Sequence, residues 1–162
     1  MTVSPFASEA RERKRAEADA VGIDDPLIAS LVDAFYARVR DDDMLGPIFA
    51  AHVADWEHHL PKMKNFWASI MIESGRFNGS PMQKHIAMGI LTKDHFDHWL
   101  TLWDRVVDEI VPNPEAAAPF HSSAHRIADS LLTGVLVQRG GLSALSKTAP
   151  KKTAPAQPED HQ

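Results

Sequence analysis

Apolar residues in the central part of the chain recur with the spacing of α-helices. The most regular stripe covers residues 96–110, where apolar side chains occupy one face for about four turns. Comparable stripes cover residues 28–39, 63–71 and 120–136, and the last of these is followed by a pair of glycines. No segment shows the alternation of apolar and polar residues that is typical of a strand. The pattern therefore predicts an all-α protein.

Glycine and proline mark the expected ends of these helices. Gly46 and Pro47 are expected to break the chain after the first stripe, and Gly79 and Pro81 follow the end of the second. The segment 82–89 (MQKHIAMG) is only about two turns long, which is too short to stay helical in water by itself. It must be held by what it packs on, either protein or a bound group.

The two ends of the chain differ in composition from the middle. Residues 1–21 are expected to form a charged N-terminal arm, because the stretch 9–20 (EARERKRAEADA) mixes acids and bases with alanine as its only apolar residue. Residues 142–162 are rich in Pro, Lys and Ala and have no large apolar residue after Leu145, which predicts a disordered tail. One folded domain is expected between them, at residues 22–141.

The overall composition excludes several classes of protein. The 162 residues contain no cysteine, which excludes disulfide frameworks, thiolate zinc sites and Cys-ligated iron–sulfur clusters. A net charge of −5 argues against nucleic acid as a partner. No apolar run approaches the roughly 18 residues of a membrane span, and residues 1–20 lack the apolar stretch of a signal peptide. These observations favour a soluble, cytoplasmic protein.

Nine histidines are the candidate metal ligands. His121 and His125 are four residues apart and His95 and His98 are three apart, so each pair could bind zinc, but two histidines do not complete a site. No glutamate lies three residues before any histidine, as a di-iron carboxylate bundle requires. His85 differs because it lies among amphipathic stretches rich in Phe, Trp and Met, as an axial haem ligand would. Spacing alone still favours an ordinary structural histidine.

Four segments of the sequence together resemble the group III truncated haemoglobins of bacteria. They are residues 34–49 (AFYARVRDDDMLGPIF), 56–67 (WEHHLPKMKNFW), 75–85 (GRFNGSPMQKH) and 95–103 (HFDHWLTLW), in that order. Each segment alone is a weak match to the family, whereas four matching segments in register make the resemblance specific. The resemblance implies a truncated 2-over-2 globin fold, in which two pairs of antiparallel helices enclose one haem b.

The resemblance also implies roles for individual residues. His85 matches the proximal ligand of the haem iron, and Tyr36, His59 and Trp99 match the distal side of the pocket. As a proximal ligand, His85 needs its second ring nitrogen bonded to a backbone carbonyl or a similar acceptor. Tyr36 and Trp99 also fall on apolar stripes, where ordinary core packing would equally suit them. Further contacts to the cofactor are expected from Phe35, Met63, Phe66, Trp67, Arg76 and Ile86.

The expected function follows from the distal donors. A phenol O–H or an indole N–H beside the iron stabilises the charge on bound O2 and slows its release. Slow release favours chemistry with O2, NO or peroxide, such as NO dioxygenase or peroxidase-like activity, over oxygen transport. An Fe(III) product would require electrons from a partner reductase. Two alternatives stay open, a haem-free helical interaction module and a non-haem metal-binding bundle.

Two positions, Phe77 and Pro61, depart from the pattern of the family, and two cations bear on the expected cofactor. Phe77 stands where family members often carry tyrosine. Pro61 lies two residues after His59, so that either a helix begins near Pro61 or a helix is kinked there. Arg76 and Lys84 lie where cations could pair with the haem propionates, although surface cations seldom need such a role.

Overall fold

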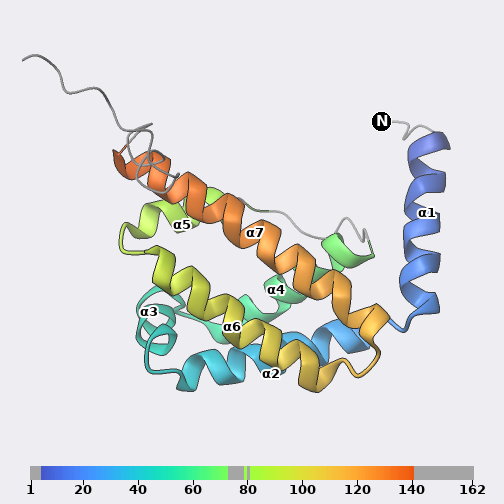
Figure 1. Ribbon diagram of the computed structural model, residues 1–162, viewed down its shortest axis with the longest axis horizontal. Coiled ribbons are helices and arrows are strands. Elements are labelled where there is room, and N and C mark those ends of the chain that lie inside the picture. Colours follow the sequence, from blue (N-terminus) through green and yellow to red (C-terminus); the bar gives the residue numbers. More distant parts are fainter. Residues whose placement is uncertain (1–4, 73–78, 80, 141–162) are drawn as a thin grey trace, which may run out of the picture.

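The computed structural model describes residues 5–72, 79 and 81–140, and these residues form seven helices and no strand (Figure 1). The all-α prediction is confirmed. The bounds of the helices are α1 Pro5–Ala20, α2 Asp25–Asp41, α3 Leu45–His52, α4 Trp56–Met71, α5 Pro81–Met88, α6 Lys93–Ile110 and α7 Pro114–Gly140.

Aspartate side chains begin two of the long helices. Asp24 precedes α2, and its carboxylate accepts a hydrogen bond from the backbone N–H of Leu27 at 2.9 Å. Asp55 caps α4 in the same way, accepting from the N–H of Glu57 at 3.0 Å. Such caps satisfy backbone donors that the first turn of a helix leaves without partners.

The predicted break at Gly46 and Pro47 is wrong, because both residues lie inside the short helix α3. Pro47 is the third residue of that helix, where its missing N–H would have no intrahelical partner. Gly46 is needed for close packing, since a Cβ atom there would lie 2.9 Å from the backbone oxygen of Arg40 at the end of α2. Glycine and proline often mark loops, but here Gly46 and Pro47 allow α3 to pack tightly against α2.

Pro61 neither begins nor ends α4. The helix starts five residues earlier, at Trp56, so the first of the two alternatives, a start near Pro61, is wrong. The N–H of His59 donates to the carbonyl of Asp55 at 3.0 Å, which places His59 in the first turn with regular helical bonding. The Asp55 cap and the first turn of α4 therefore hold His59. Pro61, which lacks an N–H donor, comes two residues later in the helix.

The core lies between α2, α4, α6 and α7, and in Figure 1 α4 lies behind α6 and α7. Phe35, Trp103 and Phe120 are fully buried at its centre. The indole N–H of Trp103 donates to the carbonyl of Phe120 at 3.1 Å, which satisfies the polar atom of the largest buried side chain and joins α6 to α7. These four helices supply the two helix pairs that a 2-over-2 arrangement requires.

Helices α5 and α1 are held in place differently from these four helices. None of the eight residues of α5 is fully buried, and the helix packs on α7, where Met82 fills the space beside Gly134. Protein therefore supplies at least part of the support that so short a helix needs. Helix α1 projects from the rest of the molecule in Figure 1 and is tied down at its end, where Ala18 joins the core. None of the described helices has the length and apolar character that crossing a membrane needs.

Candidate functional site

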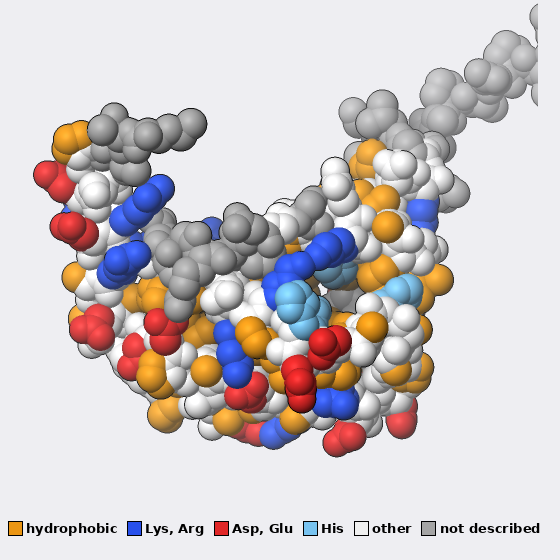
Figure 2. Space-filling view, turned by 180° about the vertical axis from the view of Figure 1, so that it is seen from behind, with side chains coloured by type: hydrophobic (Ala, Val, Ile, Leu, Met, Phe, Trp, Pro, Cys, Tyr) orange, Lys and Arg blue, Asp and Glu red, His pale blue; other side chains and the backbone are white. Residues whose placement is uncertain are grey.

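A cavity of about 590 Å³ opens between the helices on the side shown in Figure 2, where histidine and basic side chains gather around a hollow. Its volume is within the range of sites that hold small ligands and cofactors. All four residues that the sequence assigns to the iron and its ligand line this cavity, and so do three of the expected cofactor contacts. They are Tyr36, His59, His85 and Trp99, with Met63, Phe66 and Trp67.

His85 is oriented by the backbone of its own helix. Its Nδ1 lies 2.6 Å from the carbonyl oxygen of Pro81, one turn earlier in α5. Because a carbonyl accepts hydrogen bonds and never donates them, Nδ1 carries the proton. In the neutral ring the lone pair is then on Nε2, the nitrogen available to a metal. This is the arrangement that the sequence analysis required of a proximal ligand.

Tyr36 is enclosed by aromatic rings. Its own ring lies 5.8 Å from that of Phe49, 5.7 Å from that of Trp56 and 5.6 Å from that of His59, and the residue is 6% exposed. Burial raises the pKa of Tyr36 well above its usual value, so the hydroxyl stays protonated. Tyr36 is therefore a permanent hydrogen-bond donor in the wall of the cavity.

His59 carries a buried nitrogen without a partner. Its Nε2 is the one buried side-chain N or O atom of the described residues that has no hydrogen bond. Burial lowers the pKa of His59, and the nearby charges of Lys62, Lys84 and His58 lower it further, so the ring is neutral at neutral pH. A buried polar atom left unpaired is costly, and its presence beside a cavity fits a site that receives a polar ligand.

Trp99 stands at the end of a stack of three tryptophans. Its ring is nearly parallel to that of Trp103 at 5.7 Å, and Trp103 in turn stacks on Trp67 at 4.4 Å. Phe35 packs edge-on against both Trp99 and Trp103 and is fully buried, so it supports the cavity wall from behind. The indole of Trp99 is therefore held rigidly at the edge of the cavity.

The remaining expected contacts lie elsewhere. Ile86 packs against a second, smaller group of apolar residues that includes Leu91 and Phe96, and it does not line the cavity. Arg76 and Phe77 lie outside the described residues. Lys84 does line the cavity, as the expected propionate partner should.

The contribution of α3 to the site was not predicted from the sequence. The prediction of a break at Gly46 and Pro47 left no helix in this segment. The structure has one there, and three of its residues line the cavity: Leu45, Ile48 and Phe49. Their apolar spacing of three and four residues was the available signal. Lys62 was also missed, since a lysine near the start of a helix carries no signal of its own.

The cavity suits the haem that the resemblance implies. Its walls are mainly aromatic and aliphatic, and its charged side chains are Lys62 and Lys84, with no carboxylate among the described residues that line it. Haem is flat, largely apolar and carries two carboxylates, so these walls and these two cations match it. The free Nε2 of His85 and the unpaired Nε2 of His59 supply an axial ligand and a polar group for a second ligand.

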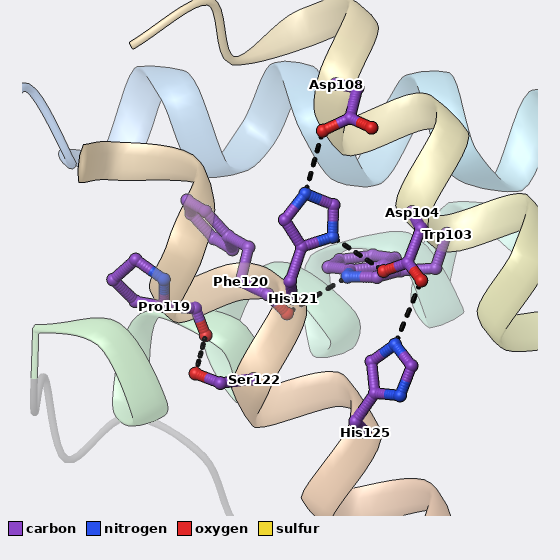
Figure 3. Close-up of polar contacts among 8 residues, drawn as sticks. All are labelled: Trp103, Asp104, Asp108, Pro119, Phe120, His121, Ser122 and His125. Atoms are coloured by element: carbon purple, nitrogen blue, oxygen red, sulfur yellow. Dashed lines mark hydrogen bonds and ion pairs between the residues drawn. The ribbon is translucent and has the colours of Figure 1, made fainter. Parts of the chain in front are cut away.

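Three of the four histidines in the pairs considered as metal ligands bind carboxylates, and the fourth, His95, accepts a hydrogen bond at Nδ1 from the backbone N–H of Thr92. His98 Nε2 lies 2.7 Å from Asp42. His121 lies between Asp104 and Asp108, at 2.6 and 2.8 Å, and His125 is 2.9 Å from the second oxygen of Asp104 (Figure 3). No group of three potential metal ligands among the described residues has the arrangement of a metal site.

Comparison with known proteins decides between the alternatives. The family model of bacterial-like globins matches residues 18–132 of this chain. The chain belongs to that family. Among its relatives, this globin is 34% identical over 123 residues to the group 3 truncated hemoglobin ctb of Campylobacter jejuni, an alignment that covers 74% of this chain and 95% of the relative.

A solved structure supports the same assignment. The crystal structure of the group III truncated hemoglobin from Campylobacter jejuni matches this globin with a TM-score of 0.64 and 32% identity, and the match covers 70% of this chain and 91% of the other. The resemblance stated from the sequence is confirmed. Membership of a globin family implies a haem cofactor, and the cavity described above accommodates one.

Proposed function

We propose that this globin binds one haem b, with His85 as the axial ligand of the iron, and that Tyr36, Trp99 and His59 act on a diatomic gas or peroxide bound there. The observation that carries the proposal is the hydrogen bond from His85 Nδ1 to the Pro81 carbonyl at 2.6 Å, which leaves Nε2 free in a cavity that also contains the three distal residues. Ferrous haem supplies an iron atom that coordinates diatomic gases.

The chain itself supplies the polar groups around the ligand. The Tyr36 hydroxyl is protonated and held by a ring cluster, and the Trp99 indole can only donate. Preorganised donors of this kind stabilise negative charge that develops on a ligand at little cost in reorganisation. Neutral His59 adds a group that donates from one nitrogen and accepts at the other.

Two or three such donors suit retention and reaction better than delivery of O2. A strongly held ligand is released slowly, so the pocket favours NO dioxygenation or peroxidase-like turnover over oxygen transport. Turnover of either kind consumes electrons, and we propose that a separate reductase supplies them. Family membership supports the gas-binding part of this proposal.

Absorbance spectroscopy of the purified protein and of His85→Ala tests the proposal. The native protein, reconstituted with haem, is expected to show a strong Soret band, and His85→Ala to lose or shift it because the axial bond is missing. Added imidazole should restore the band in His85→Ala by filling the gap with an external ligand. His95→Ala is a matched control, because His95 also lines the cavity but its Nδ1 accepts a hydrogen bond from the N–H of Thr92 at 3.0 Å.

Two results would contradict the proposal. A native protein that stays colourless and folded in the presence of haem would favour the interaction module. Iron or zinc bound without porphyrin, measured by metal analysis, would favour the non-haem bundle.

A further inference from the structure

Helix α5, which carries His85, is held on α7 by the side chain of Met82. The helix packs on α7, beside which it lies in Figure 1, and none of its residues is fully buried. The thioether of Met82 fills a notch at Gly134 of α7, where a Cβ atom on the glycine would overlap the sulfur and lie 3.0 Å from the methyl carbon. The contact between Met82 and Gly134 therefore sets how closely the first turn of α5 approaches α7.

The position of Met82 links this notch to the axial histidine. Met82 follows Pro81, whose carbonyl oxygen accepts the hydrogen bond from His85 Nδ1 at 2.6 Å. Ile86, one turn after Met82, packs in the second apolar group and holds the other half of α5. Met82 therefore fixes the turn that contains the hydrogen-bond acceptor of His85.

A thioether is an apolar group that hydrogen peroxide converts into a polar one. The sulfur lone pair forms a bond to one peroxide oxygen, the O–O bond breaks, and the proton of the transferred hydroxyl moves to the departing oxygen, which leaves as water. The sulfur loses two electrons and the peroxide gains two, so no further reactant is needed. Met82 is only partly buried, which leaves it accessible to peroxide.

The notch at Gly134 is unsuited to a sulfoxide. The added oxygen needs a hydrogen-bond donor, but the N–H groups of α7 at this level lie inside a helix and are bonded to carbonyls one turn earlier. Leu131, one turn before Gly134, and Val135, next to it, are apolar and belong to the second apolar group. An oxidised Met82 therefore gains hydrogen bonds by leaving the notch for water.

We infer that Met82 is a peroxide-sensitive anchor of α5. Oxidation of its sulfur by hydrogen peroxide releases the first turn of the helix from α7 and thereby loosens the hold on His85. The effect on His85 as a ligand of iron rests on the proposed function, whereas the release of the helix does not. Other methionines are placed differently: Met71 is buried in the core, Met44 is exposed between α2 and α3, and Met88 lines the cavity at the far end of α5.

Hydrogen–deuterium exchange of the purified full-length protein, before and after treatment with hydrogen peroxide, tests the release, with sulfoxides located by mass spectrometry of peptides. In the native chain, amide exchange in α5 is expected to become roughly 5- to 30-fold faster as Met82 is oxidised, as the loss of one buried contact implies. Methionine sulfoxide reductases should restore slow exchange. Met82→Leu should keep slow exchange after peroxide, because leucine is apolar and has no sulfur to oxidise.

Met88→Leu and Met44→Leu are the matched controls. Each removes one methionine elsewhere, so α5 should respond to peroxide as it does in the native chain. Gly134→Ala gives a second test that needs no oxidant, because the new Cβ displaces Met82 from the notch. Helix α5 of Gly134→Ala should exchange faster before any peroxide is added, and peroxide should then add little.

The hold on His85 has a readout of its own. After peroxide is removed, resonance Raman spectra of the ferrous, haem-loaded protein report the stretch of the bond between iron and histidine. We expect this band to shift or broaden in the oxidised native protein and to stay unchanged in Met82→Leu. An unchanged band despite the release of α5 overturns the link between Met82 and His85, while the proposed function stands.

The other failures are distinguishable. If the protein takes up no haem, the proposed function is wrong, and the exchange measurement alone decides whether Met82 anchors α5. Equal acceleration of α5 exchange in the native chain and in Met82→Leu overturns the inference. Oxidation of Met82 with unchanged exchange overturns it as well, and so does a Met82 that stays unoxidised when Met44 is fully converted.

Discussion

The proposed effect of Tyr36 and Trp99 on a bound ligand depends on the rings around them. The Tyr36 hydroxyl is directed by contacts with Phe49, Trp56 and His59, and Trp99 is fixed by its stack on Trp103. A donor that is already held in place loses little conformational freedom when it binds, so more of the hydrogen-bond energy is retained. Trp56 was not among the expected site residues, yet it packs on two of them and lies under the guanidinium of Arg40 at 4.8 Å.

Replacing one donor at a time should speed the release of O2. Tyr36→Phe and Trp99→Phe each remove a hydrogen bond worth about 1–2 kcal/mol, so the dissociation rate should rise roughly 5- to 30-fold in either variant. Stopped-flow displacement of O2 by CO measures that rate. Phe49→Leu is a control that disturbs the ring cluster without removing a donor, and it should change the rate less. Native rates in both donor variants would show that the distal residues do not hold the ligand.

At the scale of elements, α6 and α7 are joined by a charged cluster as well as by apolar packing. His121 on α7 lies between Asp104 and Asp108 on α6, and His125 binds the same Asp104 (Figure 3). Partial burial lowers the pKa of His121, but its hydrogen bonds to the two carboxylates outweigh that effect and raise the pKa overall. Both ring nitrogens face carboxylates, which favours the protonated ring.

The cluster predicts a pH dependence of stability. Because the pKa of His121 is raised by folding, its contribution is fully present below the pKa of the unfolded chain, about 6.5, and is lost as the pH rises through the folded value. His121→Asn should be less stable than the native protein at about pH 6 by up to about 1 kcal/mol, and the difference should shrink at about pH 9. Urea unfolding at both pH values tests this. An equal difference at both would mean that the cluster contributes packing alone.

The helices were predictable where one apolar face spans three or more turns. The stripes at residues 96–110 and 120–136 correspond to α6 and α7, because a long amphipathic face has one way to be buried. Helix α3 was missed because its first turn contains Gly46 and Pro47, and whether they break or permit a helix depends on the approach of α2, which local sequence does not contain. The Asp104–His121 contact was missed for the same reason, since it joins residues on different helices.

At the scale of the whole molecule, the charge of the cavity opposes that of the chain. The protein has a net charge of −5, yet the charged side chains that line the cavity are two lysines, with no acid among the described lining residues. This separation was not visible in the composition, which averages over the surface and the cavity. For this reason the composition could exclude classes of partner but gave no information about the cofactor.

The two ends of the chain are expected to differ in their effect on stability. Deleting residues 1–21 removes Ala18 from the core and the hydrogen bond from Arg15 Nε to the carbonyl of Ile72, so the free energy of unfolding should fall by about 1–2 kcal/mol. Deleting residues 142–162, which lie outside the described part, should change it by less than about 0.5 kcal/mol, because their composition cannot sustain packing. Urea denaturation of both shortened chains measures the difference. A large loss of stability on deleting residues 142–162 would contradict the prediction that they are disordered.

Among the helices that the structure describes, α5 alone contributes no buried residue, and His85, the proposed axial ligand, lies on it. Substitutions on such a helix leave the shared core intact, so they alter global stability little. If His85 binds the iron as proposed, substitutions on α5 would adjust the position of His85, and with it the reactivity of the iron, while the rest of the protein keeps its shape.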